Sequence, residues 1–260
     1  MTNDVSRETG VTPSLPPTPS VARRVFASER LPLIEAYGEL LASDGVVRGL
    51  IGPREVPRLW DRHLLNCAVL GRTLPAGASV CDIGSGAGLP GLVLAIARPD
   101  LEITLVEPLL RRTTFLVEVV QALGLEHVRV HRGRADSLHG TERFDVVTSR
   151  AVAPLERLLD WSMPLVAPTG SLIAMKGASV HDEIASASRV LARLGADDPE
   201  VLSLGGDVLE ETTCAVRVSW ADPSRVGLPL ASPGASSSAP TSRSTSHGKR
   251  PLRSNRKGPR

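Results

Sequence analysis

The sequence predicts an α/β protein whose mostly parallel sheet is covered by helices on both faces and preceded by a helical cap. Apolar residues repeat at helical spacing between residues 21 and 70, which indicates packed helices. From residue 78 onward, short apolar runs alternate with amphipathic segments, as expected for strand–helix–strand units. A glycine-rich turn follows the first of these runs, at the position where an open α/β sheet binds its ligand.

The first 77 residues divide into two parts. Residues 1–20 are rich in Pro, Thr and Ser, and we expect them to be disordered. Residues 21–77 are expected to form the cap, as roughly two to four helices. Tyr37 belongs to the apolar face of the first helical segment, and Pro57 opens a second segment that is apolar on one face.

The sheet is expected within residues 78–220. Strands are predicted at Val80–Ile83, Glu102–Val106, Val128–Val130, Phe144–Thr148, Ser171–Met175, Val201–Leu204 and Cys214–Val218. Helices are predicted at Leu89–Ala97, Leu109–Leu123, Leu155–Leu165 and Asp182–Leu194. The crossovers between parallel strands should be right-handed. Residues 221–260 consist mainly of Ser, Pro, Gly and Arg without any period, and we expect a disordered tail.

The charge is distributed unevenly along the chain. Residues 221–260 contain eight lysines and arginines and one acid, so they carry +7, and the other 220 residues carry −5 of the net +2. A basic tail is typical of a polyanionic partner, although it can also serve solubility alone. Aromatic residues make up only 3% of the chain, which argues against an RNA-binding platform of stacked aromatic side chains.

Composition also indicates the compartment. We expect no signal peptide, because the first ten residues are polar and charged, and no membrane span, because no apolar run is long enough. Cys67, Cys81 and Cys214 are odd in number and lack metal-ligand spacing, so neither a disulfide framework nor a metal site is predicted. These features favour a cytoplasmic protein, which we expect to be a monomer without a metal.

The segment Val80–Gly91 is the most informative motif, and two registers compete in it. Gly86, Gly88 and Gly91 satisfy the dinucleotide fingerprint, which predicts an NAD-type oxidoreductase. Asp82, Gly84, Gly86 and Gly88 satisfy the acid-plus-glycine pattern of S-adenosylmethionine enzymes. Asp82 favours the second register, because a carboxylate suits an ammonium and a sulfonium and would repel a pyrophosphate.

Two further acids complete a predicted nucleoside site. Glu107 ends the second strand, where a carboxylate can accept hydrogen bonds from both ribose hydroxyls. Ala135 and Asp136 follow the third strand, and Asp136 could accept the adenine amino group. An acid in such a loop is equally well explained as a turn or helix cap.

Four stretches of the sequence together point to one family. They are Trp60–Asn66 in the cap, Asp82–Gly91 with its Gly-Leu-Pro-Gly ending, Phe144–Ala151, and Met175–Gly177. From about residue 30 to residue 220 the chain resembles the small-subunit ribosomal RNA guanine-N7 methyltransferase G family, also called glucose-inhibited division protein B.

The resemblance implies a Rossmann-like, seven-stranded S-adenosylmethionine methyltransferase sheet with an N-terminal helical cap. It implies methyl transfer to N7 of a loop guanine in 16S rRNA, at position 527 in conventional rRNA numbering, which gives 7-methylguanosine. The motifs assign to the cofactor site Gly84, Leu89, Glu107, Ala135, Asp136 and Arg150, to which the glycine loop adds Asp82, Gly86 and Gly88. The substrate can be naked 16S rRNA, an assembly intermediate or the 30S subunit. The basic tail departs from the family pattern, so the resemblance gives it no role.

Guanine N7 chemistry fits the residues present. N7 has a free lone pair and no proton to lose, so no general base is required and catalysis rests on alignment and electrostatics.

Arg150 could hold the cofactor carboxylate or the O6 of the base, or form a structural ion pair. His63 and Asn66 share one helical face, and His63 is either a substrate-side group or an interior one. Lys176 could contact RNA phosphate or lie on the surface without a role. A non-catalytic RNA-binding protein with a vestigial pocket remains an alternative at this stage.

Overall fold

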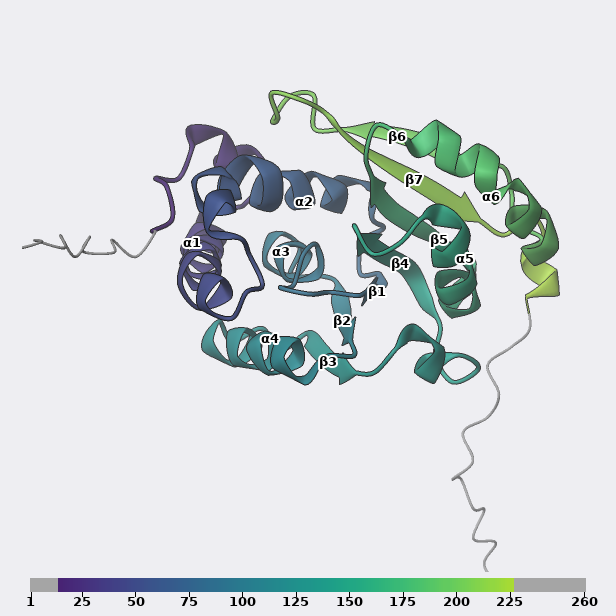
Figure 1. Ribbon diagram of the computed structural model, residues 1–260, viewed down its shortest axis with the longest axis horizontal. Helices are drawn as coiled ribbons and strands as arrows, with labels where there is room; N and C mark the ends of the chain where they lie inside the picture. Colours follow the sequence, from purple (N-terminus) through teal and green to yellow (C-terminus); the bar gives the residue numbers. More distant parts are fainter. Residues whose placement is uncertain (1–13, 227–260) are drawn as a thin grey trace, which may run out of the picture. The chain divides into compact units, whose positions relative to one another are not determined.

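The computed structural model describes residues 14–226, which form a seven-stranded sheet (Figure 1). The strands are β1 (Ser79–Ile83), β2 (Glu102–Glu107), β3 (Val128–Arg132), β4 (Phe144–Arg150), β5 (Val166–Lys176), β6 (Glu200–Leu204) and β7 (Thr213–Ser219). Their order is β3-β2-β1-β4-β5-β7-β6, with β1 to β5 parallel and β7 antiparallel to both β5 and β6. The order reverses between β1 and β4, and ligands of such sheets bind at that switch point, beyond the carboxyl ends of the strands.

Helices cover both faces of the sheet. They are α1 (Leu31–Leu40), α2 (Asn66–Ala68), α3 (Gly91–Ala97), α4 (Leu110–Ala122), α5 (Leu155–Ser162) and α6 (Val180–Leu194). Short 3₁₀ segments occupy Ser20–Arg24, Ser28–Arg30, Pro53–Arg58, Val69–Thr73, Ala135–Leu138, Met163–Leu165 and Pro223–Arg225, and π-helical segments occupy Leu41–Gly45 and Leu59–Leu65. Figure 1 shows α1 to α4 on one face of the sheet and α5 and α6 on the other.

The core consists of two apolar layers, one on each face of the sheet. The alternation of side chains along a strand produces them: in β1, Val80 belongs to the layer under α3, and Cys81 and Ile83 belong to the layer under α5 and α6. Cap residues such as Tyr37 and Leu64 are buried in the same layer as Val80. The cap and the sheet therefore share one core on that face.

Each predicted strand is present, and the α/β class and mostly parallel arrangement are confirmed, but two boundaries differ by more than two residues. The strand expected to begin at Ser171 begins at Val166, because Val166 pairs with Phe144 across an irregularity in the β4–β5 ladder. The helix expected over Leu155–Leu165 ends as an α-helix at Ser162 and continues as a 3₁₀ turn into β5.

Part of the segment that was expected to be disordered is instead packed against the cap. Within residues 14–20, the carbonyl oxygen of Pro16 accepts a hydrogen bond from Trp60 Nε1 at 2.9 Å, and the hydroxyl of Thr18 donates to Glu35. These side-chain contacts come from distant parts of the cap, so local composition does not reveal them. The predicted tail lies outside the described residues from residue 227 onward.

Among residues 14–226, no helix combines the length and the hydropathy that a membrane crossing requires. Within the same range no three His, Cys, Asp or Glu side chains gather as metal ligands, and the three cysteines are free thiols.

Candidate cofactor site

The glycine-rich loop joins β1 to α3 at the switch point of the sheet. Gly84, Gly86 and Gly88 have φ values of 67°, 59° and 99°, which favour glycine. A Cβ on Gly84 would lie 2.8 Å from Val152 Cγ2, so the loop also approaches the segment after β4 too closely for a side chain. By contrast, a Cβ on Gly86 would meet nothing nearer than 3.8 Å, which leaves open space above the backbone at that point.

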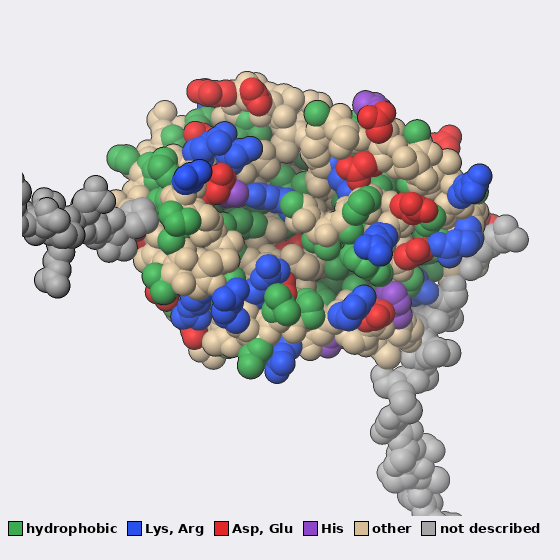
Figure 2. Space-filling model, viewed as in Figure 1, with side chains coloured by type: hydrophobic (Ala, Val, Ile, Leu, Met, Phe, Trp, Pro, Cys, Tyr) green, Lys and Arg blue, Asp and Glu red, His purple; other side chains and the backbone are tan. Residues whose placement is uncertain are grey.

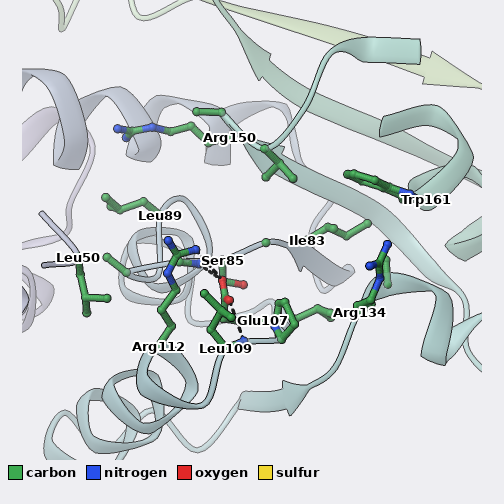
Figure 3. Close-up of a pocket in the computed structure, with 18 of the residues that line it drawn as sticks. Leu50, Ile83, Ser85, Leu89, Glu107, Leu109, Arg112, Arg134, Arg150 and Trp161 are labelled. Atoms are coloured by element: carbon green, nitrogen blue, oxygen red, sulfur yellow. Dashed lines mark hydrogen bonds and ion pairs between the residues drawn. The ribbon is translucent and has the colours of Figure 1, made fainter. Parts of the chain in front are cut away.

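A cavity of about 760 Å³ lies above this loop (Figure 3). The predicted site residues that line it are Gly84, Gly86, Leu89, Glu107, Ala135, Asp136, His63 and Arg150. They come from the ends of β1, β2 and β4, from the turn after β3 and from the cap. The sheet and the cap therefore bring together groups from five separate parts of the sequence.

Asp82 does not line the cavity, contrary to our expectation that it faces the ligand. Its side chain is fully buried, and its Oδ2 accepts a hydrogen bond from the backbone N–H of Gly91 at 3.0 Å. A Cβ on Gly91 would lie 2.7 Å from the same oxygen, so only glycine allows this contact. Burial raises the pKa of Asp82 to about 7, against the lowering effect of the Gly91 bond, and its Oδ1 has no hydrogen-bond partner. The carboxyl group thus holds the start of α3 against β1.

Gly88, the second predicted residue outside the cavity lining, also serves packing. A Cβ there would lie 2.3 Å from Leu92 Cδ1 and 3.0 Å from the hydroxyl of Tyr37. Tyr37 is fully buried and donates a hydrogen bond to the carbonyl oxygen of Ala87 at 2.8 Å. Tyr37 therefore connects the cap to the glycine-rich loop. From the sequence, Tyr37 was expected only to lie on the apolar face of a helix.

Glu107 lines the cavity and is only 1% exposed, and both of its carboxylate oxygens accept hydrogen bonds. One carboxylate oxygen accepts from the backbone N–H of Gly86 and the other from that of Leu109, both at 3.0 Å. The Arg112 guanidinium lies 3.5 Å from the first of these oxygens. Figure 3 shows Glu107 and Arg112 on the opposite side of the cavity from Arg150.

A chain of side chains joins the cap to the end of β4. The guanidinium of Arg150 donates to His63 Nδ1 and, at 3.2 Å, to the sulfur of Cys67. His63 Nε2 lies 3.0 Å from a carboxylate oxygen of Glu55. Burial and the neighbouring Arg150 lower the pKa of His63 to about 4. His63 is therefore neutral near pH 7, with its proton on Nε2, since Arg150 can only donate and Glu55 only accepts.

Lys176 is not free to contact RNA phosphate in the way that the sequence suggested. Its side chain is 7% exposed, and its ammonium lies 2.7 Å from Glu183 and 2.9 Å from the carbonyl oxygen of Ala153. Glu183 also accepts from the backbone N–H of Leu155, at the start of α5. Lys176 therefore fixes the segment between β4 and α5.

Several lining residues were not predicted. Trp161 reaches the cavity from α5, Glu55 and Leu50 reach it from the cap, and Arg112 and Arg134 stand on its β2–β3 side (Figure 3). Nothing in their local sequence marks them, because each belongs to an ordinary amphipathic or loop segment.

The family described as rRNA small subunit methyltransferase G matches residues 30–211. A protein named ribosomal RNA small subunit methyltransferase G from a Nocardioides species is 67% identical over 233 residues, covering 90% of this chain and 91% of the relative. The protein of the same name from Streptomyces avermitilis is 56% identical over 205 residues, covering 78% and 86%.

Among solved structures, a ribosomal protein L11 methylase from Lactobacillus delbrueckii subsp. bulgaricus aligns with a TM-score of 0.46 and 15% identity, over 59% of this chain and 76% of that one. This similarity is too low to support an inference about activity.

Proposed function

The chain belongs to the rRNA small subunit methyltransferase G family, and from this premise we propose that it transfers a methyl group from S-adenosylmethionine to N7 of a loop guanine in 16S rRNA. Membership in this family makes the chain a methyltransferase. It excludes the NAD-type oxidoreductase that Gly86, Gly88 and Gly91 also predicted. We further propose that it acts in the cytoplasm, where ribosomal RNA would be its partner.

The cavity has the chemistry that S-adenosylmethionine requires, and Glu107 is the observation that carries this assignment. A carboxylate has about four lone-pair positions, and the backbone N–H groups of Gly86 and Leu109 use two of them. Arg112 also reaches one of these oxygens, at 3.5 Å, so the two ribose hydroxyls would take the remaining position and the one that this long contact occupies. The open space above Gly86 leaves room for the ligand at that point.

The other parts of the cofactor have complementary groups in the same wall. Ile83, Leu109 and Trp161 offer apolar surface to adenine, beside Ala135 and Asp136. Arg150 carries five N–H donors, of which the described contacts use two, so others are available for the carboxylate of the methionine part. When bound, the cofactor supplies an electrophilic methyl group on a sulfonium.

The chain's own residues have an orienting role in this reaction. His63 is unsuited to act as a general base, because Arg150 donates to one ring nitrogen and the other nitrogen carries the proton shared with Glu55. N7 of guanine loses no proton, so the reaction requires none. His63 is better described as a positioning residue for Arg150.

The target guanine must be unpaired. N7 lies on the major-groove edge of the base, and the major groove of A-form RNA is too deep and narrow for side chains. An enzyme that methylates N7 therefore needs a guanine that is extruded from its stack.

Methyl transfer tests the proposal directly. Labelled S-adenosylmethionine is mixed with purified 16S rRNA and with 30S subunits, both from cells that lack this protein, and the modified nucleoside is identified by mass spectrometry. We expect 7-methylguanosine at a single loop guanine. Methylation of another atom or another RNA would refute the proposed target, and cofactor binding without transfer would refute the catalytic assignment.

A further inference from the structure

A second cavity adjoins the first. It has a volume of about 1510 Å³ and lies between the cap, the segment after β4, the end of β5 and the segment before β7. Both cavities are lined by Glu55, His63, Arg150, Ala151 and Val152. Figure 2 shows this face hollowed, with Lys and Arg side chains along the margin of the hollow. A molecule in one cavity can meet a molecule in the other at this shared wall.

The shared wall carries no net charge near pH 7. The hydrogen bond from His63 lowers the pKa of Glu55, so Glu55 is ionised, His63 is neutral and Arg150 is positive. The opposite charges of Glu55 and Arg150 stand on either side of the same imidazole. Because the wall has no net charge, it does not repel a positive charge that passes from a ligand in one cavity to a ligand in the other.

Asn66 lines the second cavity and not the first. It follows His63 by three positions, so the two side chains are neighbours on the helix surface. The hydroxyl of Thr213 donates to Asn66 Oδ1 at 3.3 Å, which turns the amide so that its oxygen is engaged. Within residues 14–226 this is the only hydrogen bond of the Asn66 side chain, so its two N–H donors are available.

We propose that the second cavity receives the extruded target guanine and that Asn66 selects this base by donating a hydrogen bond to O6. The inference rests on the proposed function. O6 and N7 are acceptors on the same edge of guanine, whereas adenine presents an amino group in place of O6. A base that is held through O6 therefore presents N7 towards the shared wall, and a 6-amino purine would place a donor against a donor.

The reaction at this wall balances without an added group. The lone pair of N7 forms the new N–C bond as the C–S bond breaks, and the electron pair of that bond stays on sulfur. The sulfonium becomes a neutral thioether, the base gains the positive charge, and no proton leaves.

The first experiment blocks the second cavity alone. Gly177 lines only this cavity, and a Cβ there would meet no atom within 4 Å, so Gly177→Trp is expected to fold. Ser188→Trp adds the same bulk on the exposed face of α6, outside both cavities, and serves as the control. We expect Gly177→Trp to keep its calorimetric affinity for S-adenosylmethionine and to raise the KM for RNA by about tenfold or more. An unchanged KM would overturn the cavity assignment.

The second experiment tests Asn66 with RNAs that carry guanine, inosine or 2-aminopurine at the target position. Inosine keeps O6 and N7, whereas 2-aminopurine keeps N7 and lacks O6. We expect the full-length enzyme to methylate inosine about as well as guanine, and 2-aminopurine about tenfold less efficiently. Asn66→Leu should lower kcat/KM about tenfold for guanine and inosine and leave it unchanged for 2-aminopurine.

The outcomes separate this inference from the proposed function. A merely structural role of Asn66 would lower kcat/KM equally for all three RNAs, and that result would overturn its assignment. Failure of the unsubstituted enzyme to form 7-methylguanosine on unmodified RNA would instead overturn the proposed function on which the inference rests.

Discussion

Replacing Glu107 with glutamine should weaken cofactor binding, although the two side chains have the same shape. One oxygen of Glu107 accepts from the N–H of Gly86 and the other from the N–H of Leu109, both at 3.0 Å. In Glu107→Gln, whichever way the amide is turned, its –NH₂ faces one of these two donors. A ribose hydroxyl that donates to Glu107 on that side therefore loses its charged acceptor, at a residue that is only 1% exposed.

A hydrogen bond to a charged group contributes about 1.5–3 kcal/mol, and about 1.4 kcal/mol corresponds to a tenfold change in Kd. We therefore expect the Kd for S-adenosylmethionine to rise roughly 10- to 100-fold in isothermal titration calorimetry. Glu102→Gln, at the exposed start of the same strand, should leave the Kd unchanged. Thermal unfolding of both variants shows whether the fold is retained. An unchanged Kd for a folded Glu107→Gln protein would refute the assignment of this carboxylate.

Three further substitutions test the other electrostatic assignments. Asp82→Asn should change the Kd for S-adenosylmethionine less than about threefold, because Asp82 supports Gly91 and does not face the ligand; a loss of tenfold or more would restore its predicted ligand role. The folded-state pKa of His63, about 4, lies below the unfolded value of 6.5, so its stabilising contribution is complete above pH 6.5 and declines as the pH falls towards 4. Over that window the free energy of unfolding should fall by about 3 kcal/mol more in the unsubstituted protein than in His63→Gln, and parallel urea-derived curves would contradict this. Lys176→Met should lower the unfolding free energy by about 1–3 kcal/mol and leave the salt dependence of RNA binding unchanged, whereas a shallower salt slope would show a phosphate contact.

The sequence predicted the elements well because their signals are local. The glycine loop, the end of β2 at Glu107 and the turn at Ala135 each follow an apolar strand, and parallel strands bring their carboxyl ends to one edge. Strand order was not needed to expect these residues together. The boundary at Val166 was missed because it depends on pairing with Phe144, which no local pattern encodes.

The errors in the candidate site arose where the direction of a side chain mattered. Asp82 was expected to face the ligand because it precedes the loop, but in β1 it is adjacent to Ile83, and neighbouring strand residues point to opposite faces. Ile83 lines the cavity, so Asp82 points beneath α3. Lys176 was expected to contact RNA phosphate or to lie on the surface, because its ion pair with Glu183, seven positions away in α6, cannot be seen from the local sequence.

The sequence by itself determined the α/β class, the glycine loop, the acid at the end of β2 and the resemblance to one methyltransferase family. These follow from periodicity and from short motifs, which involve residues close together in the chain. Only the tertiary structure decided that Glu55 and His63 orient Arg150, that Tyr37 supports the loop, and that a second cavity meets the first at their shared wall. The physical reason is that hydrogen bonds and cavity walls join residues far apart in the chain, such as His63 and Arg150 at 87 positions and Asn66 and Thr213 at 147, and their partners are fixed by the packing of the cap on the sheet.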